Sequence, residues 1–256
     1  MILVVDIGNT TMEFGIFDGD RLLDVFRLGS KRDISSDEVG LFASQFFEHR
    51  HIATDQVTDV IISSVVPQLN YSVTSAIKKY FGRDPYIIGE TLFCPIVNRY
   101  ENPKEVGADR LVDSYAAVQK YGAPAIIVDF GTATTCEAVS AGGEYLGGVI
   151  YPGIKTSMDA LYEKAAKLPK IELLKPDFCF GQNTVSSMQS GAYYGYLGAV
   201  EKMIEGLKAV LGKDTKVIAT GGFSRLFENE SLFDVIDQRL PLEGIRMVYE
   251  AREQNT

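Results

Sequence analysis

The chain has 256 residues, of which 46% are hydrophobic and 23% charged, a composition typical of a folded globular protein. Its 34 acidic and 25 basic residues give a net charge of −9, which argues against nucleic acid and anionic membranes as partners. Three cysteines without C-x-x-C spacing argue against a disulfide scaffold or a zinc site. No apolar run is long enough for a signal peptide or a membrane span, so we expect a cytoplasmic protein.

The first half of the chain begins with a strand and a hairpin. Residues 2–5 form a short apolar run that stops at Asp6 and Gly8, the pattern of a buried strand that feeds a tight turn. Residues 11–17 and 21–28 flank Asp18-Gly19, which predicts a β-hairpin. The remaining elements predicted in this half are a helix over 36–47, a strand over 59–63, a helix capped by Asn70 that runs to Tyr80, a strand over 85–88 and a helix over 109–121.

The second half repeats this beginning. Residues 125–128 form an apolar run that ends in Asp129 and Gly131, and a second hairpin is predicted over 136–140 and 145–150. The remaining predicted elements are a helix over 154–166, a helix over 185–211 with a break near Gly191, a strand over 216–219 and a final helix over 242–254.

This repeat predicts the domain organisation. Because helices and strands alternate after each hairpin, we expect an α/β fold with two similar tandem domains, residues 1–122 and 123–256, each built on a mixed sheet. The sequence leaves open whether the last helix stays with the second domain or packs on the first.

Each acid–glycine turn has the composition of a phosphate-binding loop. Glycine permits a sharp turn and a close approach to a ligand, and the carboxylate at the strand end can hold a divalent cation, usually through water. A single such turn is more often an Asx-type turn, but two copies in one context favour a polyphosphate held from both sides. Thr220-Gly221-Gly222 permits the same close approach after a later strand, with a simple strand-to-helix turn as the alternative.

Gly107-Ala108-Asp109-Arg110 lies where a helix is predicted to begin. Asp109 is there either the N-cap of that helix or a general base beside a basic residue that clamps a substrate. From the residues alone, the capping role is favoured.

Together these motifs resemble the acetate-and-sugar-kinase, heat-shock and actin superfamily, and within it the family of type III pantothenate kinases. The segments that carry the resemblance follow the family's order and span almost the whole chain. They are Asp6-Ile-Gly-Asn-Thr-Thr11, Gly107-Ala-Asp-Arg110, Asp129-Phe-Gly-Thr-Ala-Thr-Thr135, Leu146-Gly-Gly-Val-Ile-Tyr-Pro-Gly153, Asn183-Thr184 with Gln189-Ser-Gly191, Thr220-Gly-Gly222 and Leu242-Glu-Gly-Ile-Arg246.

The resemblance implies two actin-like, ribonuclease H-like domains with the active site in the cleft between them, and a homodimer. It also implies ATP-dependent phosphorylation of pantothenate at its primary hydroxyl, the first step towards coenzyme A, with Mg²⁺ and a monovalent cation, K⁺ or NH₄⁺.

The same resemblance assigns roles to individual residues. Asp109 would be the proton acceptor, Asp129 would bind the monovalent cation, and Asp6 would bind Mg²⁺ through water. The residues implied at the ATP site are Asp6, Ile7, Gly8, Asn9, Thr10, Thr11, Met12, Glu13, Thr132, Gly221 and Gly222. The residues implied at the pantothenate site are Tyr100, Gly107, Ala108, Asp109, Arg110 and Thr184. Two departures from the family pattern are Met12-Glu13, where a basic residue is common, and the segment around Phe223-Ser-Arg225.

Two other functions stay open at this point. One is a different small-molecule kinase or a phosphohydrolase of the same superfamily, which would present water to the terminal phosphate. The other is a non-catalytic, nucleotide-dependent regulator on the same fold. The Asp109-Arg110 pair argues against a regulator, because a pure binding protein needs no base there.

Overall fold

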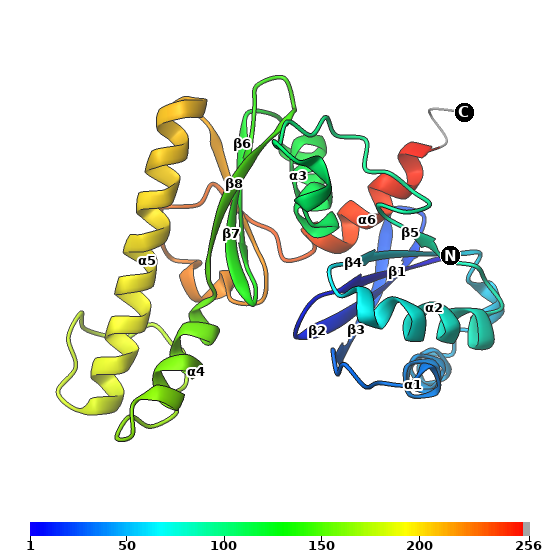
Figure 1. Ribbon diagram of the computed structural model, residues 1–256, viewed down its shortest axis with the longest axis horizontal. Helices are drawn as coiled ribbons and strands as arrows, with labels where there is room; N and C mark the ends of the chain where they lie inside the picture. The colour runs from blue at the N-terminus through cyan, green and yellow to red at the C-terminus, as the bar shows by residue number, and fades with distance from the viewer. Residues whose placement is uncertain (253–256) are drawn as a thin grey trace. The chain divides into compact units, whose positions relative to one another are not determined.

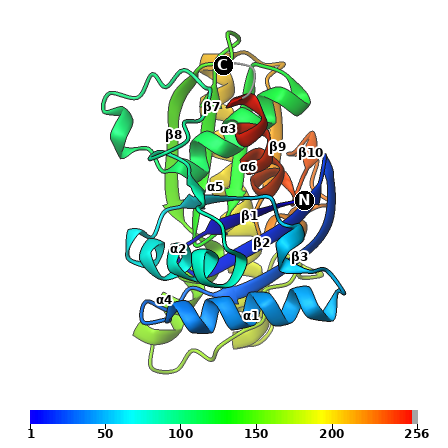
Figure 2. The same cartoon turned by 90° about the vertical axis from the view of Figure 1, so that its right-hand side faces the viewer.

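The computed structural model describes residues 1–252, which form two compact units. Within the described residues, unit 1 comprises Met1–Ile96, Asn102–Ala116 and residues 240–252, and unit 2 comprises Val97–Glu101 and Ala117–Arg239. Figures 1 and 2 together label the helices and strands of both units. Each unit is discontinuous in the sequence, and the tandem division at residue 122 stays a prediction.

Unit 1 is built on a five-stranded mixed sheet with the strand order β3-β2-β1-β4-β5. Its strands are β1 (Ile2–Ile7), β2 (Thr11–Asp18), β3 (Arg21–Gly29), β4 (Asp59–Ser64) and β5 (Tyr86–Ile87). β1, β2 and β3 pair antiparallel, whereas β1, β4 and β5 pair parallel. An antiparallel hairpin therefore joins a parallel centre, as the sequence predicts.

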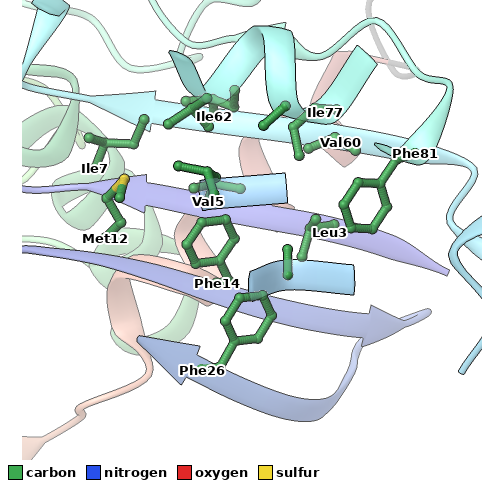
Figure 3. Close-up of a cluster of buried hydrophobic side chains, with 14 of the residues drawn as sticks. Leu3, Val5, Ile7, Met12, Phe14, Phe26, Val60, Ile62, Ile77 and Phe81 are labelled. Carbon is green, nitrogen blue, oxygen red and sulfur yellow. The ribbon is translucent and has the colours of Figure 1, made fainter. Parts of the chain in front are cut away.

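One face of this sheet carries the main core of unit 1. Leu3, Val5 and Ile7 alternate along β1 toward this face, and all three are fully buried. Figure 3 shows them together with side chains of the neighbouring strands and of α2. Two helices, α1 (Ser36–His49) and α2 (Pro67–Phe81), lie side by side over this face (Figures 1 and 2).

The opposite face of the same sheet is covered by the last helix. Helix α6 (Leu240–Ala251) packs on β1 and β4, where its Leu242 and Ile245 meet Val4. A β-carbon on Gly244 would lie 2.7 Å from a methyl of Val112 in α3 (Ala108–Tyr121), so α6 and α3 approach closely at a position that only glycine allows. The structure thereby settles what the sequence leaves open, since α6 belongs to unit 1. The end predicted for this helix, residue 254, lies outside the described residues.

Unit 2 repeats the sheet of unit 1. Its strands are β6 (Ala125–Phe130), β7 (Ala133–Val139), β8 (Tyr145–Pro152), β9 (Lys216–Thr220) and β10 (Val235–Ile236). They are ordered β10-β9-β6-β7-β8, with antiparallel pairing within β6, β7 and β8 and parallel pairing of β6, β9 and β10. β6 takes the place of β1, and β9 takes the place of β4. The predicted α/β fold with two copies of one mixed sheet is confirmed.

Unit 2 contains two further helices, α4 (Ile154–Lys164) and α5 (Thr184–Leu211). The predicted break near Gly191 is wrong, because α5 runs as a single helix of 28 residues. Glycine inside a helix costs only about 1 kcal/mol, and Ala192, Tyr193 and Tyr196 next to it are buried in the core of unit 2. Tertiary packing therefore outweighs the local glycine signal. Within residues 1–252, no helix has both the length and the apolar composition needed to cross a membrane.

The predicted cap at Asn70 is also wrong. Helix α2 begins at Pro67, and proline is favourable at the first helical position because its missing N–H has no partner there in any case. Asn70 lies inside the helix, where its Oδ1 accepts a hydrogen bond of 2.6 Å from the hydroxyl of Ser64. The remaining short elements are the 3₁₀ turns Thr54–Gln56, Pro103–Glu105 and Ser224–Phe227.

Candidate active site

The first acid–glycine turn joins β1 to β2 in unit 1. The N–H of Gly8 donates to the carbonyl of Thr11 at 3.1 Å. Ser30, just after β3, closes the turn from the other side, since its hydroxyl donates to the Gly8 carbonyl at 2.6 Å and its N–H donates to the Thr10 carbonyl at 3.0 Å. Asn9 and Thr10 are exposed at the tip. The turn is therefore held by its own backbone and by Ser30, and it presents two polar side chains to solvent.

Three residues predicted at the ATP site differ in what they can offer a ligand. The side chains of Ile7 and Met12 are fully buried in the core of unit 1, so only their backbone atoms could meet a ligand. Glu13 forms an ion pair of 2.8 Å with Arg27 on β3. At this departure from the family pattern, the chain therefore has an acidic residue that is paired with a basic residue of the neighbouring strand.

The second turn joins β6 to β7 in unit 2 and is one residue shorter. The N–H of Gly131 donates to the carbonyl of Ala133 at 3.0 Å. The carbonyl of Thr132 accepts hydrogen bonds from the N–H of Gly153 at 3.1 Å and from the hydroxyl of Thr156 at 2.7 Å. A β-carbon on Gly153 would lie 2.4 Å from the Thr132 oxygen. The start of α4 therefore anchors the backbone of this turn, while the Thr132 side chain stays exposed.

A tyrosine supports the second turn from α5. The hydroxyls of Tyr196 and Thr134 are hydrogen-bonded, and Tyr196 also donates to the carbonyl of Pro152 at 2.9 Å. Burial raises the pKa of Tyr196 to about 12, so its hydroxyl keeps its proton at neutral pH. Sequence reasoning missed this residue, as it missed Ser30, because only the fold brings these hydroxyls to the turns.

The Thr220-Gly221-Gly222 segment lies directly beside the second turn. β9 runs parallel to β6, with Thr220 opposite Asp129. Gly221 has φ +87°, and a β-carbon there would lie 2.3 Å from Asp129 Oδ1 and 2.6 Å from the Phe130 nitrogen. Only glycine fits this position. The structure thus brings Asp129, Gly221 and the second turn together at the carboxyl ends of parallel strands, where α/β sheets usually bind ligands.

Asp109 lies in the first turn of α3, which begins at Ala108. The predicted alternative, an N-cap, is therefore wrong, because the residue before the helix is Gly107. A carboxylate in the first turn still interacts favourably with the helix dipole. Asp109 Oδ1 accepts the N–H of Arg110 at 2.8 Å, and a β-carbon on Gly107 would lie 2.4 Å from the same oxygen.

The Asp109 carboxylate consequently folds back over Gly107 and lies near the end of β4. A β-carbon on Gly107 would also lie 3.2 Å from a methyl of Val65, the residue that follows β4. The N–H of Val65 in turn donates to the carbonyl of Ile7 at the end of β1, at 3.1 Å. Asp109 thus lies at the end of the sheet that carries the first acid–glycine turn. Arg110, the next residue of α3, is only 9% exposed.

Two predicted substrate residues, Tyr100 and Thr184, belong to unit 2. The ring of Tyr100 lies against Gly147 of β8, where a β-carbon would be 3.4 Å from the ring, and its centroid is 6.4 Å from that of Tyr145. Thr184 is the first residue of α5, after an N-cap at Asn183 whose side chain accepts the N–H of Ser186 at 2.9 Å. The other predicted substrate residues, 107–110, belong to unit 1.

The sequence profile of the type III pantothenate kinase family matches residues 2–206, which is most of the chain. The chain belongs to this family of kinases. The two acid–glycine turns and the Gly107–Arg110 segment all lie within the matched residues, so the recognition made from the motifs is confirmed.

Solved structures share the fold at low sequence identity. A Campylobacter jejuni protein assigned to the Baf family of transcriptional activators has a TM-score of 0.62 at 20% identity, covering 99% of this chain and 100% of that one. A Sinorhizobium meliloti protein assigned as a 2-dehydro-3-deoxygalactonokinase has a TM-score of 0.65 at 12% identity, covering 98% and 96%. The activator of 2-hydroxyisocaproyl-CoA dehydratase from Clostridium difficile has a TM-score of 0.53 at 12% identity, covering 99% and 96%. These similarities support the actin-like fold.

Proposed function

We propose that this family member transfers the terminal phosphoryl group of ATP to the primary hydroxyl of pantothenate. The observation that carries this proposal is the duplicated acid–glycine turn, found at equivalent ends of two sheets with the same topology. Support for a nucleotide comes from the C. difficile activator, which has this fold and contains bound ADPNP. Support for pantothenate comes from the family to which the chain belongs.

In this proposal the nucleotide is held mainly by backbone groups. The first turn, Asp6 to Glu13, and Thr132 of the second turn would donate N–H and hydroxyl groups to the phosphates, while Gly221 and Gly222 would let the nucleotide approach the backbone. Asp6 and Glu13 are directly opposite each other on β1 and β2, and carboxylate oxygens are the ligands that Mg²⁺ prefers. These residues therefore fit a magnesium ion, which would neutralise phosphate charge when bound.

Asp109 and Arg110 would act on the acceptor. Phosphoryl transfer depends mainly on positioning and on charge stabilisation, but the attacking hydroxyl must lose its proton. Asp109 would accept that proton, and the Arg110 guanidinium would bind the anionic end of pantothenate. Tyr100, Gly107, Ala108 and Thr184 would complete the acceptor site.

A monovalent cation and a cytoplasmic location complete the proposal. Asp129 would hold K⁺ or NH₄⁺ beside the second turn, where the chain supplies one carboxylate next to the hydroxyl-bearing residues Thr135 and Thr220. Because neither turn contains a lysine, positive charge at the phosphates must come from cations and backbone amides.

An ADP-release assay tests this function against its alternatives. We expect ADP release to require pantothenate and to be supported by potassium or ammonium but hardly by sodium. ADP release that occurs without pantothenate and is unaffected by it would point instead to a phosphohydrolase, whereas ADP release that appears only with another small alcohol would point to a kinase for that alcohol. Nucleotide binding without any ADP release would favour the non-catalytic regulator.

We also propose a homodimer formed through unit 2. The family resemblance implies this dimer, and α5 contributes little apolar surface to it through Tyr193 and Tyr196, because both are buried in the core of the unit. Other large apolar side chains of unit 2 are exposed instead, among them Phe178 at 70%, Phe180 at 64% and Ile150 at 64%. The ring centroids of Phe178 and Phe180 lie 6.4 Å apart, and contiguous exposed apolar surface commonly marks a protein interface.

Light scattering at micromolar concentration should therefore give a mass twice the 28.2 kDa of one chain. The double substitution Phe178→Ser with Phe180→Ser should shift the mass toward that of one chain, because it removes two exposed rings from the interface. Tyr71→Ser, which removes an 81% exposed ring from α2 of unit 1, is the matched control. A wild-type mass equal to one chain would contradict the dimer.

A further inference from the structure

In each unit, the acid at the strand end lies in a row of three side chains across neighbouring strands. In unit 1, Asp6 is opposite Glu13 of β2 and Ser63 of β4. Side chains at directly opposite positions share one face of a sheet, with β-carbons about 4.5–5.5 Å apart. Asp6 is therefore flanked on both sides by oxygen-bearing side chains.

Unit 2 has the equivalent row with a different composition. Asp129 is opposite Thr135 of β7 and Thr220 of β9. The row in unit 1 contains two carboxylates, one of them paired with Arg27, whereas the row in unit 2 contains one carboxylate and two neutral hydroxyls. Divalent magnesium is usually bound by carboxylates and water, while rings of neutral oxygen atoms suit potassium. The second row thus has the chemistry of a site for a monovalent cation.

Thr220 is the unusual member of the second row. Its side chain is fully buried, and its Oγ1 has no hydrogen-bond partner among the described residues. An unsatisfied buried hydroxyl costs about 1–3 kcal/mol, and valine would fill the same space without that cost. Ser63, at the equivalent place beside Asp6, is 1% exposed and likewise has no hydrogen-bond partner for its Oγ within residues 1–252.

The neighbouring residue Ser64 shows that a hydroxyl without a hydrogen-bond partner is specific to the row of three side chains and is not general at the strand end. Ser64 follows Ser63 in β4, and its hydroxyl donates to Asn70 at 2.6 Å and accepts the N–H of Val66 at 3.2 Å. The unsatisfied hydroxyl thus occurs at the register position of the acid in both units. A ligand that meets both the acid and the hydroxyl would remove the energetic cost.

We infer that Thr220 is a ligand of the monovalent cation that Asp129 binds, so that its Oγ1 and the Asp129 carboxylate would together hold K⁺ or NH₄⁺. The inference rests on the proposed function and deepens it at the cation site. Gly221 follows directly, and a β-carbon there would lie 2.3 Å from Asp129 Oδ1, so the close approach of this segment to Asp129 restricts the relative positions of Thr220 and the acid. Thr220 is in this view a determinant of which cation the enzyme uses.

Thermal unfolding of the full chain tests this inference without relying on activity. The protein, with Mg²⁺ and ADP, is titrated with potassium chloride at constant ionic strength maintained by choline chloride. If a cation binds only the folded state, the midpoint temperature of unfolding rises as the cation concentration increases. We expect Thr220→Val to match or exceed the wild-type midpoint in choline chloride, because it removes an unsatisfied hydroxyl. The half-saturating potassium concentration should rise about tenfold or more, since an oxygen contact to a charged group is lost.

Matched variants make the test specific. Thr220→Ser keeps the hydroxyl and should keep the potassium response even if its midpoint falls. Ser114→Ala is the control, because Ser114 in α3 is also fully buried with a hydroxyl that lacks a hydrogen-bond partner in the described part of the chain, but it lies in no strand row. If Thr220→Val does not fold, Thr220→Ala takes its place.

The possible outcomes separate this inference from the proposed function. The role of Thr220 would be overturned if Thr220→Val had the same half-saturating potassium concentration as the wild type, or if Thr220→Ser lost the potassium response. Either result would leave the kinase proposal intact. A wild-type protein that phosphorylates pantothenate but does not respond to potassium would overturn the cation site and this inference together. A potassium response that depends on Thr220 in a protein inactive toward pantothenate would support the inference and reject the substrate.

Discussion

Replacing Asp109 with asparagine should lower kcat for pantothenate-dependent ADP release by about 100-fold or more. Asparagine has the size of aspartate and keeps the side-chain oxygen that accepts the Arg110 N–H at 2.8 Å, so the start of α3 should keep its structure. It cannot accept the proton of the attacking hydroxyl. We therefore expect the unfolding midpoint and the affinity for ADP to stay near wild type while turnover falls.

A matched control separates the loss of a base from the loss of a charge. Glu105 is an exposed carboxylate in the 3₁₀ turn just before α3, where it accepts a hydrogen bond of 2.7 Å from the Asn102 side chain. Glu105→Gln removes the same unit charge close to the site and should leave kcat within about twofold, as for most surface substitutions. A folded Asp109→Asn protein with undiminished kcat would exclude Asp109 as the proton acceptor.

Replacing Gly221 with alanine should destabilise the protein by about 2–4 kcal/mol. The residue has φ +87°, which L-residues rarely adopt, and the new β-carbon would lie 2.3 Å from Asp129 Oδ1 and 2.6 Å from the Phe130 nitrogen. Backbone atoms of β6 cannot move aside without distorting the sheet. The affinity for ADP should also fall, because the shifted backbone belongs to the proposed nucleotide site.

Gly222 provides the control for this second substitution. A β-carbon there would meet nothing within 4 Å, and its φ is not in the left-handed region. Gly222→Ala should therefore change the free energy of unfolding by less than about 1 kcal/mol. Urea denaturation of both variants measures the difference, and equal stability of Gly221→Ala and wild type would contradict the close contact with Asp129.

Local sequence patterns predict the repeated architecture and the positions of the two turns. Apolar runs that end in Asp6-x-Gly8 and Asp129-x-Gly131 predict buried strands with tight turns, and the residues that follow predict hairpins. The structure confirms both copies with the same strand order. These predictions succeed because side-chain alternation and turn glycines depend on residues that are close together in the chain.

The predicted helix caps and the predicted helix break were wrong where a neighbouring residue or tertiary packing had a stronger effect than the residue on which the prediction relied. Asn70 has a good capping side chain, but Pro67 starts the helix three residues earlier. Gly191 is a poor helix former, but the burial of Tyr193 and Tyr196 holds α5 continuous. Asp109 fits a capping position, but α3 already begins at Ala108. Each of these outcomes depends on an energy difference that the local sequence does not show.

Which residues lie side by side across the sheets depends on long-range packing. The apolar stripe of α6 could cover many surfaces, and its place on β1 and β4 depends on Gly244, which lets the helix approach Val112 of α3. The pairing of Asp129 with Thr220, and of Asp6 with Ser63, depends on strand register between segments far apart in the chain. Register and helix packing arise from the combined burial of many side chains, so no short stretch of sequence contains the information that fixes them.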